Sequence, residues 1–142
     1  NRKAYHDYEV LETFKAGIVL TGTEIKSVRA GKVSLAEGYG SIENGEIILH
    51  GVNISPYENG THYNHEPLRP RKLLLTKQEI KKLTVKVQEK GLTLIPLKMF
   101  FSKSWAKVDL GLCRGKKLHD KRKTLTERDV KRDIDRALKN RY

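Results

Sequence analysis

The sequence predicts a mainly β protein, with six strands and two helices in the order β-β-α-β-β-α-β-β, closed into a small β-barrel. Three observations lead to this fold: near-alternating apolar residues, an Asn-Gly turn between two β-rich segments, and a capping box that opens a helical pattern. An antiparallel sheet this short avoids exposed edges best when it closes on itself. The 142 residues suit one such domain with an appendage.

The first elements follow from a change of period. Apolar residues nearly alternate over residues 8–20, and Gly17 predicts a break between two β segments there. Over residues 21–29 the apolar spacing becomes helical, with Thr21 or Thr23 as the N-cap that satisfies free backbone amides. We therefore expect two strands followed by a short helix.

A hairpin and a long loop come next. Asn44-Gly45 lies between β-rich segments within residues 36–52, and this dipeptide favours the positive φ angles of a tight turn. Residues 55–70 collect proline, glycine and asparagine, which predicts a long loop.

The second helix is the clearest in the chain. Thr76 and Glu79 make a capping box, helical spacing follows, and Gly91 supplies a stop. Two β-rich segments, residues 92–102 and 105–115, then predict a final pair of strands.

The C-terminal segment differs from this body. Residues 115–123 have no apolar periodicity and should be flexible when free. Thr124 and Glu127 form another capping box before a sparse apolar stripe at helical spacing, too weak to hold a lone helix in water. The sequence thus predicts a body over residues 1–114 and a basic tail over residues 115–142 that becomes helical when bound.

Charge indicates the class of partner. The net charge is +12, and residues 114–142 hold 12 of the 29 Lys and Arg but 5 of the 17 Asp and Glu. Such asymmetry predicts a polyanionic partner. Nucleic acid is favoured over a membrane, because Tyr142 is the tail's single aromatic residue and apolar runs stay far short of the roughly 20 residues that span a bilayer.

No catalytic or metal motif stands out. The nucleophile-elbow, Walker and dinucleotide-binding patterns do not occur. Cys113, the single cysteine, lies in a predicted strand as a small buried hydrophobe and fits a reducing cytosol, and His62-x-x-His65 is a solvated loop more readily than a metal site. Glu24 on the first helix has no assignable catalytic partner. We expect no enzyme, no metal and no cofactor.

Three basic clusters of the body fit an RNA surface. NRKAYHDY, at residues 1–8, interleaves cations with rings that could stack on bases, or it is a charged arm leading into the first strand. Arg29-Ala-Gly-Lys32 could grip a phosphate backbone, or it is an ordinary helix C-cap. Arg69-Pro-Arg71-Lys72 places three cations near a helix N-terminus, which itself attracts phosphate.

Several long blocks resemble the SsrA-binding protein (small protein B, SmpB) family. In order along essentially the whole chain, they are NRKAYHDYEVLETFKAGIVLTGTEIKSVRAGK, NISPY, RPRKLLL, KGLTLIPLKMFF and GKKLHDKR. The resemblance implies an OB-type barrel in the bacterial cytoplasm that binds the tRNA-like domain of transfer-messenger RNA (tmRNA), as a monomer. It also implies delivery to the A site of stalled ribosomes for trans-translation, with the tail in the decoding centre and the empty mRNA channel.

The resemblance also implies site residues. For tmRNA they are Asn1, Arg2, Lys3, His6, Lys26, Arg29, Lys32, Lys72 and Leu74. For the ribosome they are Gly115, Lys116, Lys117, His119, Asp120, Lys121, Arg122, Arg128, Lys131 and Arg132. It implies for Glu24 a structural role, orienting the helix and the loop near the RNA site.

One position departs from the family pattern. The residue before Ala-Gly in the FxAG stretch is usually acidic in the family and has been linked to tmRNA binding, whereas here it is Lys15. We therefore leave Lys15 out of the predicted site. An alternative function is a ribosomal or general RNA-coating protein that binds RNA without selectivity.

Overall fold

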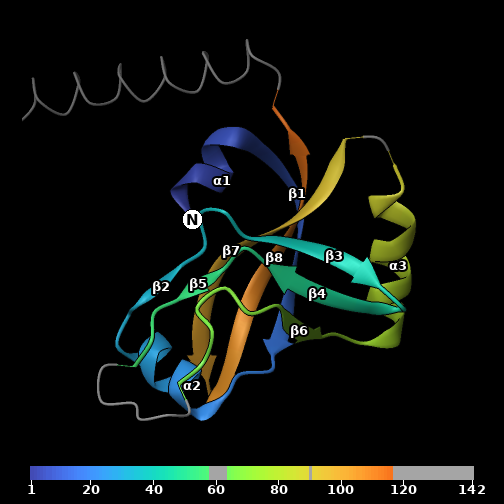
Figure 1. The fold of residues 1–142 in the computed structure, drawn as a ribbon. Helices are drawn as coiled ribbons and strands as arrows, with labels where there is room; N and C mark the ends of the chain where they lie inside the picture. Colours follow the sequence, from blue (N-terminus) through green and yellow to red (C-terminus); the bar gives the residue numbers. More distant parts are fainter. Residues whose placement is uncertain (58–63, 90, 117–142) are drawn as a thin grey trace, which may run out of the picture.

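Antiparallel strands close into a barrel in the part of the chain that the computed structural model describes, residues 1–57, 64–89 and 91–116 (Figure 1). The elements in chain order are α1 (Arg2–Asp7), β1 (Tyr8–Ile18), α2 (Gly22–Arg29), β2 (Val33–Ser34), β3 (Tyr39–Glu43), β4 (Glu46–His50), β5 (Asn53–Ile54), β6 (Arg71–Leu74), α3 (Lys77–Val87), β7 (Leu92–Ser102) and β8 (Trp105–Gly115). Within this part, six strands form the barrel in the order β1-β6-β4-β3-β7-β8, and β2 pairs with β5 beside it. The predicted mainly β fold with flanking helices is confirmed.

Local signals in the sequence placed two helices well. Thr21 caps α2 and Thr76 caps α3, and each makes a reciprocal capping box with the glutamate three residues later. The predicted span of the first helix is confirmed. The second ends at Val87, before the predicted stop at Gly91, whose φ of +85° belongs to the turn that follows.

Two tight turns connect long strand pairs. Asn44 and Gly45 have φ angles of 51° and 76°, which confirms the predicted hairpin between β3 and β4. Lys103 and Ser104 have φ angles of 50° and 69° at the tip of the β7–β8 hairpin. This second turn brings the end of β7 and the start of β8 together, with Trp105 at the tip.

Three predictions about the strands and the N-terminus were wrong. Gly17 does not break a strand, because β1 runs through it and pairs with β6 on one side and β8 on the other. Residues 71–74, where the sequence predicted no strand, form barrel strand β6. The N-terminal residues, for which a charged arm was one of two interpretations, form α1, because Asn1 accepts a hydrogen bond from the Ala4 amide and Ala4 is buried.

The core fills the barrel with side chains from the inward faces of its strands. Ile47, Leu49, Leu94 and Leu110 are fully buried there, and Leu83 of α3 is fully buried against the same cluster. Each such side chain stabilises the fold by roughly 1.5–3 kcal/mol. The helices α1 and α2 lie at opposite ends of the barrel, and α3 lies along another side (Figure 1).

Candidate nucleic-acid interface

A buried ion-pair cluster holds α2 against the barrel. The Glu24 carboxylate accepts hydrogen bonds from Arg71 Nε at 2.5 Å and from Arg69 Nη2 at 2.6 Å. Both Glu24 and Arg71 have 0% of their surface exposed. Burial alone would raise the pKa of Glu24, but hydrogen bonds from Arg69, the Thr21 amide and Arg71 outweigh it and lower the pKa to about 2. We call Glu24, Arg69 and Arg71 the α2 clamp.

The α2 clamp corrects one prediction and agrees with another. Arg71 was expected to bind phosphate, but it is buried and donates to the carbonyls of Val52 and Pro67 as well as to Glu24. It therefore stabilises the body and does not face a ligand. The geometry of Glu24 agrees with its expected structural role, because its carboxylate joins α2 to β6 and to the loop before it.

The exposed side of α2 carries cations that lie over aromatic rings. Lys26 Nζ is 5.1 Å from the centre of the Tyr57 ring, and the Arg29 guanidinium is 4.9 Å from that of Phe101 on β7. Lys32 follows Gly31 and is exposed. These cations, Lys26, Arg29 and Lys32, form the α2 cationic cluster. The rings position Lys26 and Arg29 without neutralising their charge.

The N-terminal residues are placed differently. Asn1 caps α1 and donates from its side chain to the carbonyls of Leu35 and Pro96, so it fixes the helix to the body. Lys3 Nζ lies 2.5 Å from a Glu37 oxygen, and His6 Nδ1 lies 2.9 Å from Asp7. Arg2 is exposed. The predicted residues at this end are thus brought together, but most are held by neighbouring groups.

A hollow extends from α1 along one side of the body. It has a volume of about 520 Å³ and runs from α1 past residues 33–36 to β7, where Lys98 and Met99 line it. Figure 1 shows the β2–β5 pair between α1 and α2 on this side of the molecule. Lys98 is exposed, and its ammonium lies 5.6 Å from the Phe100 ring. Sequence reasoning missed Lys98, although a lysine two residues before a Phe-Phe pair was a usable signal.

Another hollow surrounds the predicted residue Leu74. It measures about 410 Å³, and its lining includes Val19, Ile25, Leu74, Trp105 and Lys107. Trp105 is 70% exposed and Leu74 49% exposed. We call this site the tryptophan groove. Sequence reasoning missed Trp105 and Lys107, but a single tryptophan beside a lysine at a turn was a signal that could have found them.

Lys72 lies apart from the α2 cationic cluster. It is on β6, and its ammonium is 3.1 Å from an oxygen of Glu46 on β4. This pair is exposed and should contribute little to stability. The structure therefore does not bring Lys72 into the α2 cationic cluster.

Lys15 has an acidic residue opposite it. It is exposed on β1 and pairs in register with Asp109 on β8, which in turn pairs with Lys98 on β7. Asp109 is thus the register partner of two lysines on neighbouring strands, and its Oδ1 is buried without a hydrogen-bond partner.

The predicted ribosome-binding residues divide at the end of the described chain. Gly115 is the last residue of β8, and Lys116 donates from its amide to the Asp7 carbonyl and from its ammonium to the Tyr5 carbonyl. These two residues belong to the body and lie against α1. The others lie outside the described residues: Lys117, His119, Asp120, Lys121, Arg122, Arg128, Lys131 and Arg132.

Comparisons with known proteins identify the family. A family model described as "SmpB protein" matches residues 1–140. The chain belongs to the SmpB family. The SsrA-binding protein of Carboxydothermus hydrogenoformans is 56% identical over 142 residues, which are 100% of this chain and 95% of that protein. The SsrA-binding protein of Microcystis aeruginosa is 59% identical over 140 residues, covering 98% of this chain and 91% of that protein.

A solved structure supports the same assignment. It is described as "tmRNA-SmpB: a journey to the center of the bacterial ribosome". It matches with a TM-score of 0.71 and 55% identity, over 83% of this chain and 83% of that one. The similarity therefore extends to the fold as well as to the sequence of the family.

Two residues considered above for metal binding or catalysis, His65 and Cys113, have structural roles in the fold. His65 has one ring nitrogen 2.9 Å from the Thr23 hydroxyl and the other 2.7 Å from the Ile54 carbonyl, so it ties the loop to α2, whereas His62 lies outside the described residues. Cys113 is buried, and burial raises the pKa of its thiol to about 11. Within residues 1–57, 64–89 and 91–116, no group of three His, Cys, Asp or Glu could hold a metal ion. None of the helices in the same ranges is long and apolar enough to span a membrane.

Proposed function

We propose that this chain binds tmRNA and brings it to the A site of stalled ribosomes, acting in the bacterial cytoplasm as a non-catalytic adaptor. The observation that carries the proposal is membership in the SmpB family along nearly the whole chain, with SsrA-binding proteins as relatives. The words that describe the related solved structure mention both tmRNA and the bacterial ribosome.

The barrel holds the tRNA-like domain of tmRNA, as one copy per tmRNA. The α2 cationic cluster meets phosphates, because its charges are exposed and two of them, Lys26 and Arg29, are held in position by rings. The tryptophan groove receives an unstacked base or a sugar edge, since Trp105 offers an exposed ring beside Lys107. Arg2 and Lys98 extend the basic face toward α1.

The tail binds the ribosome. Its residues from Lys117 onward carry most of the predicted decoding-centre contacts, with the His119 ring stacking on a base and Lys121 and Arg122 meeting phosphate. In this proposal the body ends after Lys116, because Gly115 completes β8 and Lys116 contacts α1.

Truncation tests this division. A chain ending after Lys116 keeps all the described elements of the barrel, so tmRNA affinity in a gel-shift assay should stay within about threefold of the full chain. Tagging of stalled products in a reconstituted translation reaction should fall to background. A truncated chain that no longer binds tmRNA would show that the division of labour is wrong.

Competition tests the alternative of general RNA coating. At fixed salt, unlabelled tmRNA should displace labelled tmRNA at concentrations at least 100-fold lower than bulk tRNA does. Equal displacement by the two RNAs would favour coating, because phosphate contacts alone carry no selectivity.

Incubation with labelled tmRNA and Mg²⁺ tests the non-catalytic role. The RNA should remain full length with wild type, as with a no-protein control. Cleavage that depends on the protein and increases with its concentration would contradict it.

A further inference from the structure

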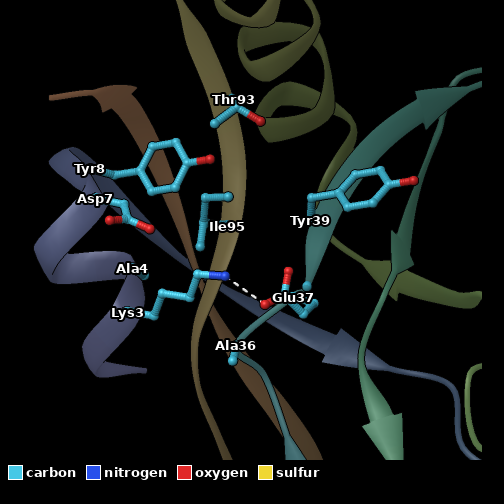
Figure 2. Close-up of a pocket in the computed structure, with 10 residues that line it drawn as sticks. Lys3, Ala4, Asp7, Tyr8, Ala36, Glu37, Tyr39, Thr93 and Ile95 are labelled. Carbon is cyan, nitrogen blue, oxygen red and sulfur yellow. Dashed lines mark hydrogen bonds and ion pairs between the residues drawn. The ribbon is translucent and has the colours of Figure 1, made fainter. Parts of the chain in front are cut away.

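A pocket lies at the α1 end of the barrel, away from the α2 cationic cluster and the tryptophan groove. Its volume is about 500 Å³, which is in the range of sites that hold small ligands. Figure 2 shows it between α1, the start of β3 and the first part of β7. Its lining is Lys3, Ala4, Asp7, Tyr8, Ala36, Glu37, Gly38, Tyr39, Thr93 and Ile95.

One wall of this α1 pocket is flat and apolar. The Tyr8 ring extends toward Thr93 and Ile95 on β7, as Figure 2 shows. Ile95 is 5% exposed and packs in a small cluster with Ala4, so this part of the wall is fixed by the fold. A ring and a branched aliphatic side chain together suit a planar ligand that can stack.

The opposite wall is held in place by stacking. The Tyr39 and His50 rings lie with centroids 5.3 Å apart and 21° between their planes. His50 Nε2 lies 3.1 Å from the Ser41 hydroxyl and 3.1 Å from a Glu43 oxygen, which orients the imidazole. The Tyr39 ring points away from Tyr8 and Ile95 (Figure 2), so this stacking orders the start of β3 before a ligand binds, which lowers the entropy cost of binding.

The polar groups of the α1 pocket fit the edge of a base. Lys3 Nζ and Glu37 Oε1 are 2.5 Å apart and place a donor beside an acceptor, and Thr93 adds a hydroxyl. Every nucleobase carries donors beside acceptors on its Watson–Crick edge, which RNA-binding proteins read in unpaired bases. Asp7 and Glu37 together outweigh the charge of Lys3, so a phosphate group would be repelled from the interior.

We propose that the α1 pocket binds one unpaired nucleobase of RNA, with the phosphate left outside. The last described residue, Lys116, contacts the carbonyls of Asp7 and Tyr5, so the tail leaves the body next to α1. This inference rests on the proposed function, because that function brings the tail, and with it the α1 pocket, close to ribosomal RNA. The base enters the pocket when the tail is in the decoding centre.

Nucleotide titration of the full-length chain tests the pocket directly. The probes are AMP, GMP, CMP and UMP, added at fixed salt to isotope-labelled protein, with amide chemical shifts as the readout. At least one nucleotide should move the amides of Tyr8, Thr93 and Ile95 in a saturable way. Ribose 5-phosphate should leave them unchanged, because it has no base.

Two variants and a matched control sharpen this test. Ala36→Phe fills the rim of the α1 pocket and Glu37→Gln removes the acceptor charge, and each should weaken the nucleotide response at least fivefold. Glu89→Gln changes an exposed carboxylate after α3 that pairs with Lys86 and does not line the pocket, and it should leave the response unchanged. Proton spectra of all three variants establish that they are folded.

Other outcomes overturn the inference. An absence of shifts with every nucleotide would exclude a base pocket, and so would equal shifts with ribose 5-phosphate. Arginine amide serves as a cationic probe without a nucleobase, and saturation by this probe alone would also exclude a base pocket. A gel shift with tmRNA on the same sample distinguishes a failure of the α1 pocket from a failure of the proposed function. If the wild-type chain binds tmRNA but shows no nucleotide response, base binding by the α1 pocket alone is refuted. If the wild-type chain does not bind tmRNA at all, the proposed function is refuted.

Discussion

The two ends of the barrel present cations in different electrostatic surroundings. At the α1 end, Lys3 contacts Glu37, and Lys116 donates to the carbonyl of Tyr5. At the α2 end, Lys26 and Arg29 lie over aromatic rings. The α2 end should therefore supply more of the affinity for phosphate, although both ends have similar residues in the sequence. The number of cations in a segment does not by itself measure its capacity to bind RNA.

The difference extends to how each end is held. The α2 end depends on the α2 clamp, which is charged and buried. The α1 end depends on Asn1 and on the small apolar cluster around Ala4. Changes to charge should therefore unfold the α2 end first and leave the α1 end less affected.

The largest expected effect comes from Glu24→Gln. Removing this charge leaves Arg71 buried without its carboxylate, which should lower the free energy of unfolding by about 3–5 kcal/mol. Urea denaturation followed by circular dichroism measures it. Glu46→Gln, the control, removes an exposed pair with Lys72 and should cost less than about 1 kcal/mol. Similar losses for both variants would show that the clamp does not set the stability of the α2 end.

The α2 clamp also predicts how stability depends on pH. The folded pKa of Glu24 is about 2, below its ordinary value of 4.5, so its contribution is complete above pH 4.5 and is lost as the pH falls toward 2. This contribution is worth on the order of 3 kcal/mol. Urea midpoints between pH 6 and pH 3 should fall less steeply in Glu24→Gln than in wild type. Parallel curves would contradict the assignment of the depressed pKa to Glu24.

Charge removal at the two ends tests the comparison most directly. The double variant Lys26→Gln with Arg29→Gln should weaken tmRNA binding about 30-fold at fixed salt and reduce the slope of log K against log salt by roughly 2. Arg2→Gln with Lys3→Gln removes the same formal charge at the α1 end and should weaken binding less than fivefold. Equal losses at the two ends would refute the view that local partners decide which cations bind phosphate.

The tryptophan groove gives a smaller expected effect. Trp105→Ala should weaken tmRNA binding about tenfold, because one stacked base is worth roughly 1–3 kcal/mol. Trp105→Phe keeps a ring and should recover most of the loss. Val85→Ala removes another exposed apolar side chain, on α3, and should leave binding unchanged. An unchanged affinity for Trp105→Ala would remove the groove from the tmRNA surface.

Sequence reasoning succeeded where the determining interactions are local. The capping boxes at Thr21 and Thr76 span three residues, and Asn44-Gly45 sets its own turn, so these features could be predicted without knowing the rest of the fold. It failed for β6, because only four residues form that strand and their partners lie on β1 and β4. It also failed for α1, whose six residues are too few to show a helical period.

The candidate site divides in the same way. The cations of the α2 cationic cluster were found from the sequence, since the basic residues and the glycine at the helix end are visible there. Their positions over Tyr57 and Phe101 were not, because these rings come from distant parts of the chain. The exposure of Trp105 depends on the β7–β8 turn and on the closing of the barrel, so only the fold shows it.

By itself, the sequence determined the mainly β class, two helices, one hairpin turn and the basic character of the chain. Tertiary structure alone decided that Arg71 is a buried partner of Glu24, that Lys3 contacts Glu37, and that Lys116 lies against α1. The physical reason is range: caps and turns depend on neighbours within a few residues. Burial and charge pairing depend on side chains that are 34 or 47 positions apart and meet only when the barrel closes.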